Sequence, residues 1–163
     1  MKKLLAIVLA ILSAFSMTAV AYAGNTTTIS TTVPDATYTL NIPADQTIEF
    51  GDTSHNIGDV SITNSSGFAE GKNLAVTIIY DSFSSADTTT VIPYKINRYT
   101  GQGYAGVHVA SGSQLTFKGY ATGAVSTSPE TLIMLIESAN WGKALGGHYS
   151  TTITFTAEVV VED

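Results

Sequence analysis

Residues 149–161 read Tyr-Ser-Thr-Thr-Ile-Thr-Phe-Thr-Ala-Glu-Val-Val-Val, and this stretch decides the expected fold. Its side chains alternate along an extended chain. One side would carry Tyr149, Thr151, Ile153, Phe155, Ala157, Val159 and Val161. The other side would be mostly Thr, and a period of two is the pattern of a β-strand with one buried face. The stretch therefore predicts a strand that packs against a core.

The same alternation recurs upstream, at residues 38–42, 48–50, 60–62, 74–80, 92–96 and 115–117. Residues 131–136 form a continuous apolar run, whose shortness and bounding turns favour a strand buried on both faces. Seven or eight short strands with no clear amphipathic helix predict an all-β fold. We expect an antiparallel β-sandwich of immunoglobulin-like or pilin-like type, with a jelly roll as the alternative.

The apolar residues inside these patterns form the expected core. They are Leu40, Ile42, Val60, Ile62, Val76, Ile78, Ile133, Leu135, Ile153 and Phe155.

The first 23 residues have the three parts of a secretion signal. Lys2 and Lys3 supply positive charge, residues 4–15 are almost entirely apolar, and Ala21 and Ala23 stand at the −3 and −1 positions of a cleavage site. The alternative, a transmembrane anchor, would need about 20 apolar residues. We expect cleavage after Ala23, a single β-sandwich domain over residues 24–163, and a secreted protein located outside the cell or on its surface.

Composition and charge narrow the classes of partner. Removal of residues 1–23 leaves five basic against 13 acidic side chains, a net charge of −8. Nucleic acids and anionic membranes attract basic surfaces, so neither is an expected partner of the mature chain. The sequence has no cysteine, which excludes disulfides, thiolate metal sites and thiol nucleophiles.

Three stretches resemble secreted bacterial surface β-sandwich proteins of the pilin, fimbrial-subunit or adhesin type. Residues 147–157 are similar to a Gly-x-Tyr-x-x-x-Ile-x-Phe last strand, and Trp141-Gly142-Lys143-Ala144 to the approach to that strand. Residues 33–44 look like the opening of surface β-domains. The resemblance implies a surface or appendage protein rather than an enzyme. It departs from many usher-assembled pilins in having no cysteine pair.

The motifs that could indicate catalysis, a cofactor or a metal lack the flanking elements or the spacing that such sites require. Residues 101–106 match G-x-G-x-x-G, but a β-like run follows where dinucleotide binding needs a helix. Asp52, His55 and Asp59 have the spacing of neither a calcium loop nor a zinc motif, and they are typical turn residues. No Gly-x-Ser-x-Gly elbow is present. We therefore expect no catalytic, cofactor or metal residues.

Two functions remain open. The first is a structural or adhesive surface protein that associates with other surface or appendage subunits, including its own copies. The alternative is a carbohydrate-binding module or small lectin that takes a host or cell-wall glycan. Its candidate ligand contacts are Tyr99, Tyr104, Tyr120 and Trp141. Trp141 would either cap the core or lie exposed as a sugar or protein contact.

Residues 24–32 are Thr-rich and uncharged. Ile29 and Val33 stand four positions apart, which places both on one face of an extended strand. Such a segment can add to an open sheet edge of another subunit through main-chain hydrogen bonds. The alternative is a frayed terminus or a first strand paired within its own domain.

Overall fold

The structure is a computed structural model that describes residues 29–31, 35–101 and 106–161. The chain divides into two compact units, Met1–Thr32 and Val33–Asp163. All described strands lie in the second unit, and the expected signal segment lies outside the described residues. Among the described helices, none combines the length and apolarity that a membrane span requires.

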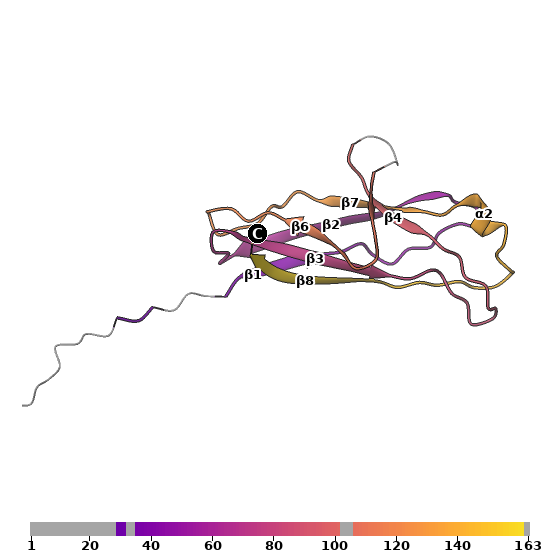
Figure 1. Ribbon diagram of the computed structural model, residues 1–163, viewed down its shortest axis with the longest axis horizontal. Helices are drawn as coiled ribbons and strands as arrows, with labels where there is room; N and C mark the ends of the chain where they lie inside the picture. Colours follow the sequence, from indigo (N-terminus) through magenta and orange to yellow (C-terminus); the bar gives the residue numbers. More distant parts are fainter. Residues whose placement is uncertain (1–28, 32–34, 102–105, 162–163) are drawn as a thin grey trace, which may run out of the picture. The chain divides into compact units, whose positions relative to one another are not determined.

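In the described part of the chain eight strands form two antiparallel sheets, and the expected antiparallel β-sandwich is confirmed (Figure 1). The larger sheet has the order β1 (Thr37–Asn41), β2 (Ser54–Ser66), β7 (Glu130–Leu135), β4 (Lys95–Arg98) and β5 (Val107–Val109). The smaller sheet has the order β6 (Ser113–Phe117), β3 (Lys72–Tyr80) and β8 (Ile153–Val161). β3 is its centre, with β6 and β8 at the two edges.

The core lies between the sheets, and five of the ten residues expected in it are buried. Val60, Ile62, Val76, Ile78 and Ile133 are buried. Leu40, Leu135, Ile153 and Phe155 are only half-buried. The expectation for Ile42 is wrong: β1 ends at Asn41, so Ile42 leaves the sheet and its side chain is 53% exposed.

The continuous apolar run forms β7, and its strand assignment is confirmed. Leu132, Ile133 and Met134 are consecutive and all buried, so both faces of this strand are covered. β7 lies between β2 and β4 in the middle of the larger sheet.

Three expected strand boundaries are wrong. Residues 48–50 form no strand, and Phe50 is 78% exposed. β4 begins at Lys95, because Ile92 instead makes an isolated bridge with Phe83. The last strand begins at Ile153 rather than at residue 149, since the preceding residues hold only a bridge between Ser150 and Ser84.

The inward-facing side chains of β8 become more exposed toward the end of that strand. Ile153, Phe155 and Ala157 pack against the core, as the alternation predicts. Val159 and Val161 are exposed, although Val159 pairs with the fully buried Leu74 of β3.

Two local features outside the strands matter below. A single helical turn, α2 (Ser138–Trp141), follows β7 and was not expected from the sequence. After β6 the chain passes so close to β3 that a Cβ at Gly119 would lie 1.8 Å from the Lys72 carbonyl oxygen. Only glycine fits that approach.

Candidate functional site

The strand β8 has one free edge. It pairs with β3 along its whole length, from Lys72 opposite Val161 to Tyr80 opposite Ile153. No described strand pairs with its other edge. In an antiparallel ladder every second residue directs its N–H and C=O to one side, so this edge offers a row of backbone donors and acceptors.

A groove runs beside the first part of this edge. At one end the two sheets are joined, because the Tyr38 hydroxyl on β1 donates to the Ala157 carbonyl on β8 at 3.3 Å. Beyond Asn41 the chain leaves the sheet, and the space between residues 42–50 and residues 146–155 opens into a groove of about 890 Å³. Apolar core side chains form its floor, among them Ile57, Ile92, Met134 and Phe155.

Exposed apolar side chains surround the groove. Ile42 and Phe50 stand on one wall and Leu145, which is 58% exposed, on the other. The Phe50 ring meets the Trp141 indole edge-on, with ring centroids 5.4 Å apart. An uncovered apolar surface of this kind usually marks a place where another molecule binds.

The wall of residues 42–50 is held by polar side chains rather than by strand pairing. The Gln46 side-chain nitrogen donates to the Ile57 carbonyl, and Gln46 Oε1 lies 3.0 Å from His55 Nε2. The Trp141 indole N–H donates to the Asp52 carbonyl at 2.8 Å. The sequence analysis missed Gln46 as a site residue, and its only signal was a polar residue between two apolar patterns.

The opposite wall is fixed by the Gly-x-Tyr stretch that the resemblance singled out. The Tyr149 hydroxyl donates to the Leu145 carbonyl at 3.0 Å and also lies 3.1 Å from Thr88 Oγ1. Ser150 exchanges two backbone hydrogen bonds with Ser84. These contacts hold the chain extended until it enters β8.

The candidate ligand-contact residues are not gathered on one face. Tyr99 directly follows β4 and Tyr120 lies in the connection after β6, and each is about half exposed. Neither ring contacts another aromatic ring among the described residues. Trp141 is half-buried at the end of α2 with its indole N–H bonded internally, and Tyr104 lies outside the described residues.

The proposed strand-exchange segment is described only in part. Ile29 is exposed, and Val33 lies outside the described residues. The glycine-rich motif at 101–106 is likewise incomplete, because residues 102–105 are not described.

The acidic and histidine residues of the first loop do not converge on one point. Asp52 Oδ2 lies 3.7 Å from His55 Nδ1, but Asp59 accepts a hydrogen bond from the Thr131 hydroxyl at 2.6 Å. Over the described ranges no group of three histidine or acidic side chains could hold a metal ion.

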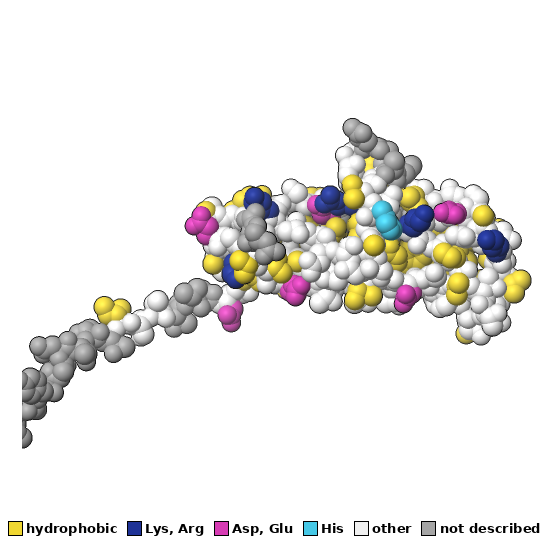
Figure 2. Space-filling model, viewed as in Figure 1, with side chains coloured by type: hydrophobic (Ala, Val, Ile, Leu, Met, Phe, Trp, Pro, Cys, Tyr) yellow, Lys and Arg dark blue, Asp and Glu magenta, His cyan; other side chains and the backbone are white. Residues whose placement is uncertain are grey.

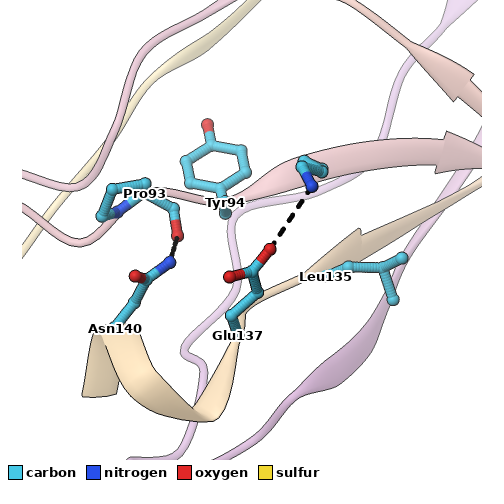
Figure 3. A pocket seen from close by; sticks show the side chains of 6 residues that line it. Pro93, Tyr94, Leu135, Glu137 and Asn140 are labelled. Carbon is cyan, nitrogen blue, oxygen red and sulfur yellow. Dashed lines mark hydrogen bonds and ion pairs between the residues drawn. The ribbon is translucent and has the colours of Figure 1, made fainter. Parts of the chain in front are cut away.

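A smaller hollow of about 330 Å³ lies beside α2 (Figure 3). There Asn140 Nδ2 donates to the Pro93 carbonyl at 2.9 Å, and Lys95 pairs with Glu137 at 3.3 Å. Both partners of that ion pair are mostly exposed, and such pairs contribute little to binding or stability.

Charge is spread thinly over the surface. Figure 2 shows basic and acidic side chains scattered over the visible face of the sandwich, some of them next to a side chain of opposite charge. The groove is lined by one acidic residue, Asp45, and by one histidine, His148. A ligand for the groove should therefore be largely uncharged and apolar.

A scan against protein-family models finds no match, and a search of curated proteins finds no similar sequence. The geometry of the groove and the free edge therefore carries the functional argument.

Proposed function

We propose that this chain is a secreted structural or adhesive subunit of a bacterial cell surface, of the pilin or adhesin kind, which acts through protein–protein association. The observation that carries the proposal is the free edge of β8 beside an apolar groove. A sheet edge binds an extended strand through main-chain hydrogen bonds, and pockets beside it accept alternate side chains. The expected secretion signal at residues 1–23 supports a place outside the cell.

The occupant of the groove is residues 24–33 of a second copy. That stretch is uncharged, as is most of the groove lining, and as an extended strand it would present Ile29 and Val33 on one face. Its ten residues would span about 33 Å when extended, which is close to the length of the nine-residue β8.

The position of the groove favours an open chain of copies. Residues 35–37, where the preceding chain joins the sandwich, lie near the end of β2, since Thr37 pairs with Ser66. α2 lies near the opposite end of β2 (Figure 1), and Trp141 at the end of α2 lines the groove. A donor at one end and an acceptor at the other give a head-to-tail contact, which extends into a filament unless rotation closes a ring.

Glycan binding is less well supported. Sugar sites present flat, accessible aromatic rings close together. Here the exposed tyrosines stand on separate connections, and the Trp141 indole N–H is used inside the protein.

The test compares the mature chain, residues 24–163, with a chain that starts at residue 33. The longer chain should form concentration-dependent oligomers in analytical ultracentrifugation, and the shorter one should stay monomeric with an unchanged β-type circular dichroism spectrum. A synthetic peptide of residues 24–34 should bind the shorter chain. The same peptide with Ile29→Asp is the matched control and should bind at least tenfold more weakly, because it would bury an unpaired charge.

Two results would overturn the proposal. One is a mature chain that remains monomeric at millimolar concentration while the peptide fails to bind. The other is equal binding of the Ile29→Asp peptide, which would show that the groove does not recognise that face. Binding of cell-wall oligosaccharides by the monomer would favour the glycan alternative.

A further inference from the structure

Large apolar side chains lie exposed at one end of the sandwich. β8 ends there, far from α2 (Figure 1), and its last inward-facing residues, Val159 and Val161, are exposed. Val161 pairs with Lys72 of β3, and Gly119 lies against the Lys72 carbonyl. Tyr120, which follows Gly119, is also exposed. We call Tyr120, Val159 and Val161 the base of the sandwich.

The chain enters the sandwich beside the base. The Tyr38 hydroxyl on β1 donates to the Ala157 carbonyl, two residues before the first valine of the base. Asp35 lies next to Gly67, where a Cβ would be 2.9 Å from the Asp35 carbonyl oxygen. The first described residues of the sandwich and the end of β8 are therefore neighbours.

The connection between the donated strand and its own sandwich is short. Only Pro34 stands between Val33, the last residue of that strand, and Asp35. Two successive Cα–Cα steps span at most about 7 Å. When residues 24–33 of one copy lie in the groove of the next copy, the two sandwiches must therefore touch.

The groove directs this contact toward the end that carries α2. Its other end is blocked where Tyr38 bonds to Ala157, so the donated strand leaves beside Phe50 and Leu145. The Phe50 ring packs against the Trp141 indole, and both Phe50 and Leu145 are exposed. We call Phe50 and Leu145 the mouth of the groove.

We propose that the base of one copy packs against the mouth of the groove of the next copy. The copies would then be joined by an end-to-end contact in addition to the donated strand. Packing these two sets of exposed apolar side chains together removes apolar surface from water, which is favourable. The contact also limits rotation about the short connection, so an assembled filament would be stiff rather than hinged. This inference rests on the proposed function, because the donated strand is what brings the two ends together.

Cross-linking tests which ends meet. The sequence has no cysteine, so introduced cysteines react without background. Mature chains with Val161→Cys are mixed with mature chains with Leu145→Cys and treated with a short bis-maleimide. A cross-linked dimer should form in the mixture and in neither chain alone, because unlike ends meet in a head-to-tail contact. Val107→Cys, on the edge strand β5, replaces Val161→Cys in the control mixture and should give no cross-linked dimer.

A charge in the base tests how much the contact contributes to assembly. Val161→Asp in the mature chain should weaken self-association in analytical ultracentrifugation at least about tenfold, because the carboxylate would be buried without a partner. Val107→Asp is the matched control, since Val107 is 55% exposed and Val161 63%, and it should associate like the unsubstituted chain. In the chain that starts at residue 33, Val161→Asp should leave binding of the peptide of residues 24–34 unchanged, because the peptide brings no base with it.

Failure of the end-to-end contact and failure of the proposed function are distinguishable. If the peptide binds but Val161→Asp associates as strongly as the unsubstituted chain, or the oligomers give no cross-link between positions 145 and 161, the contact is refuted and the proposed function stands. A peptide that never binds refutes the proposed function, and the contact falls with it. If Val161→Asp does not fold, as judged by circular dichroism, the cross-link decides.

Covering of the base by residues 24–33 of the same copy is the alternative outcome. Val161→Asp would then lower the Tm of the mature chain more than that of the chain that starts at residue 33, and the mature chain would stay monomeric. That result would overturn the inference.

Discussion

The replacement Phe155→Ala tests whether the groove is open. Phe155 lies on β8 opposite Ile78, packs against the core and also lines the groove, so one side of its ring lacks protein neighbours. Phe117 lies on the other edge strand of the same sheet, opposite Leu74, and is 1% exposed. The two phenylalanines therefore differ chiefly in how completely they are enclosed.

How completely each ring is enclosed determines how much free energy of unfolding its replacement should cost. Replacing a fully buried phenylalanine by alanine costs about 3–5 kcal/mol, because packing contacts vanish and a cavity remains. Phe117→Ala should cost that much. Phe155→Ala should cost only about 1–3 kcal/mol, since part of the ring already faces solvent and no closed cavity is created.

The assay is thermal unfolding of the chain that starts at residue 33, followed by circular dichroism. For a domain of this size 1 kcal/mol corresponds to a shift in Tm of about 3–4 °C. Phe117→Ala should therefore lower Tm by about 9–20 °C and Phe155→Ala by about 3–12 °C. Equal losses, or a larger loss for Phe155→Ala, would show that its ring lies in a closed core, and the groove would then not exist as described.

Three further predictions concern the rest of the sandwich. Gly119→Ala should cost at least about 2 kcal/mol in chemical denaturation, because its Cβ would lie 1.8 Å from a backbone oxygen, whereas Gly146→Ala, with nothing within 4 Å, should be neutral. Trp141→Phe should cost about 1–2 kcal/mol, since the Asp52 carbonyl loses its indole donor; an unchanged denaturation midpoint would contradict that bond. Burial raises the pKa of Tyr94 above the ordinary tyrosine value of 10.0, so the folded state keeps a proton that the unfolded chain releases. Stability should be undiminished below about pH 10 and fall above it, and the fall should be shallower in Tyr94→Phe when unfolding is compared at pH 8 and pH 11.

The sequence predicts the strands with long alternation well and the short ones poorly. β3 and β8 each have nine residues, and their alternation identifies the inward side chains along most of their length. The pair Ile48 and Phe50 alternates too, yet it forms no strand. Period two shows which side chains share a face, but it does not show whether a neighbouring strand has an edge available for pairing.

The groove itself could not be read from the sequence for the same reason. It exists because no described strand occupies the place beside β8, which is a property of strand order. The contact between His55 and Gln46, nine positions earlier, likewise spans a stretch without regular structure and follows no sequence pattern. Residues 24–33 alone suggested strand addition, and no sequence pattern indicated where that strand would bind.

The pairing of β3 with β8 has a consequence for the time course of folding. These partners lie far apart in the chain, since Lys72 pairs with Val161 and Tyr80 with Ile153. Contacts between such distant segments form slowly, because closing the long loop costs chain entropy before the pairing contributes any favourable free energy. The smaller sheet is also incomplete until residues 153–161 are available, because only β3 and β6 can pair before then. A growing chain therefore lacks the β3–β8 pairing until residues 153–161 have been synthesised, and we expect refolding from denaturant to take milliseconds to seconds.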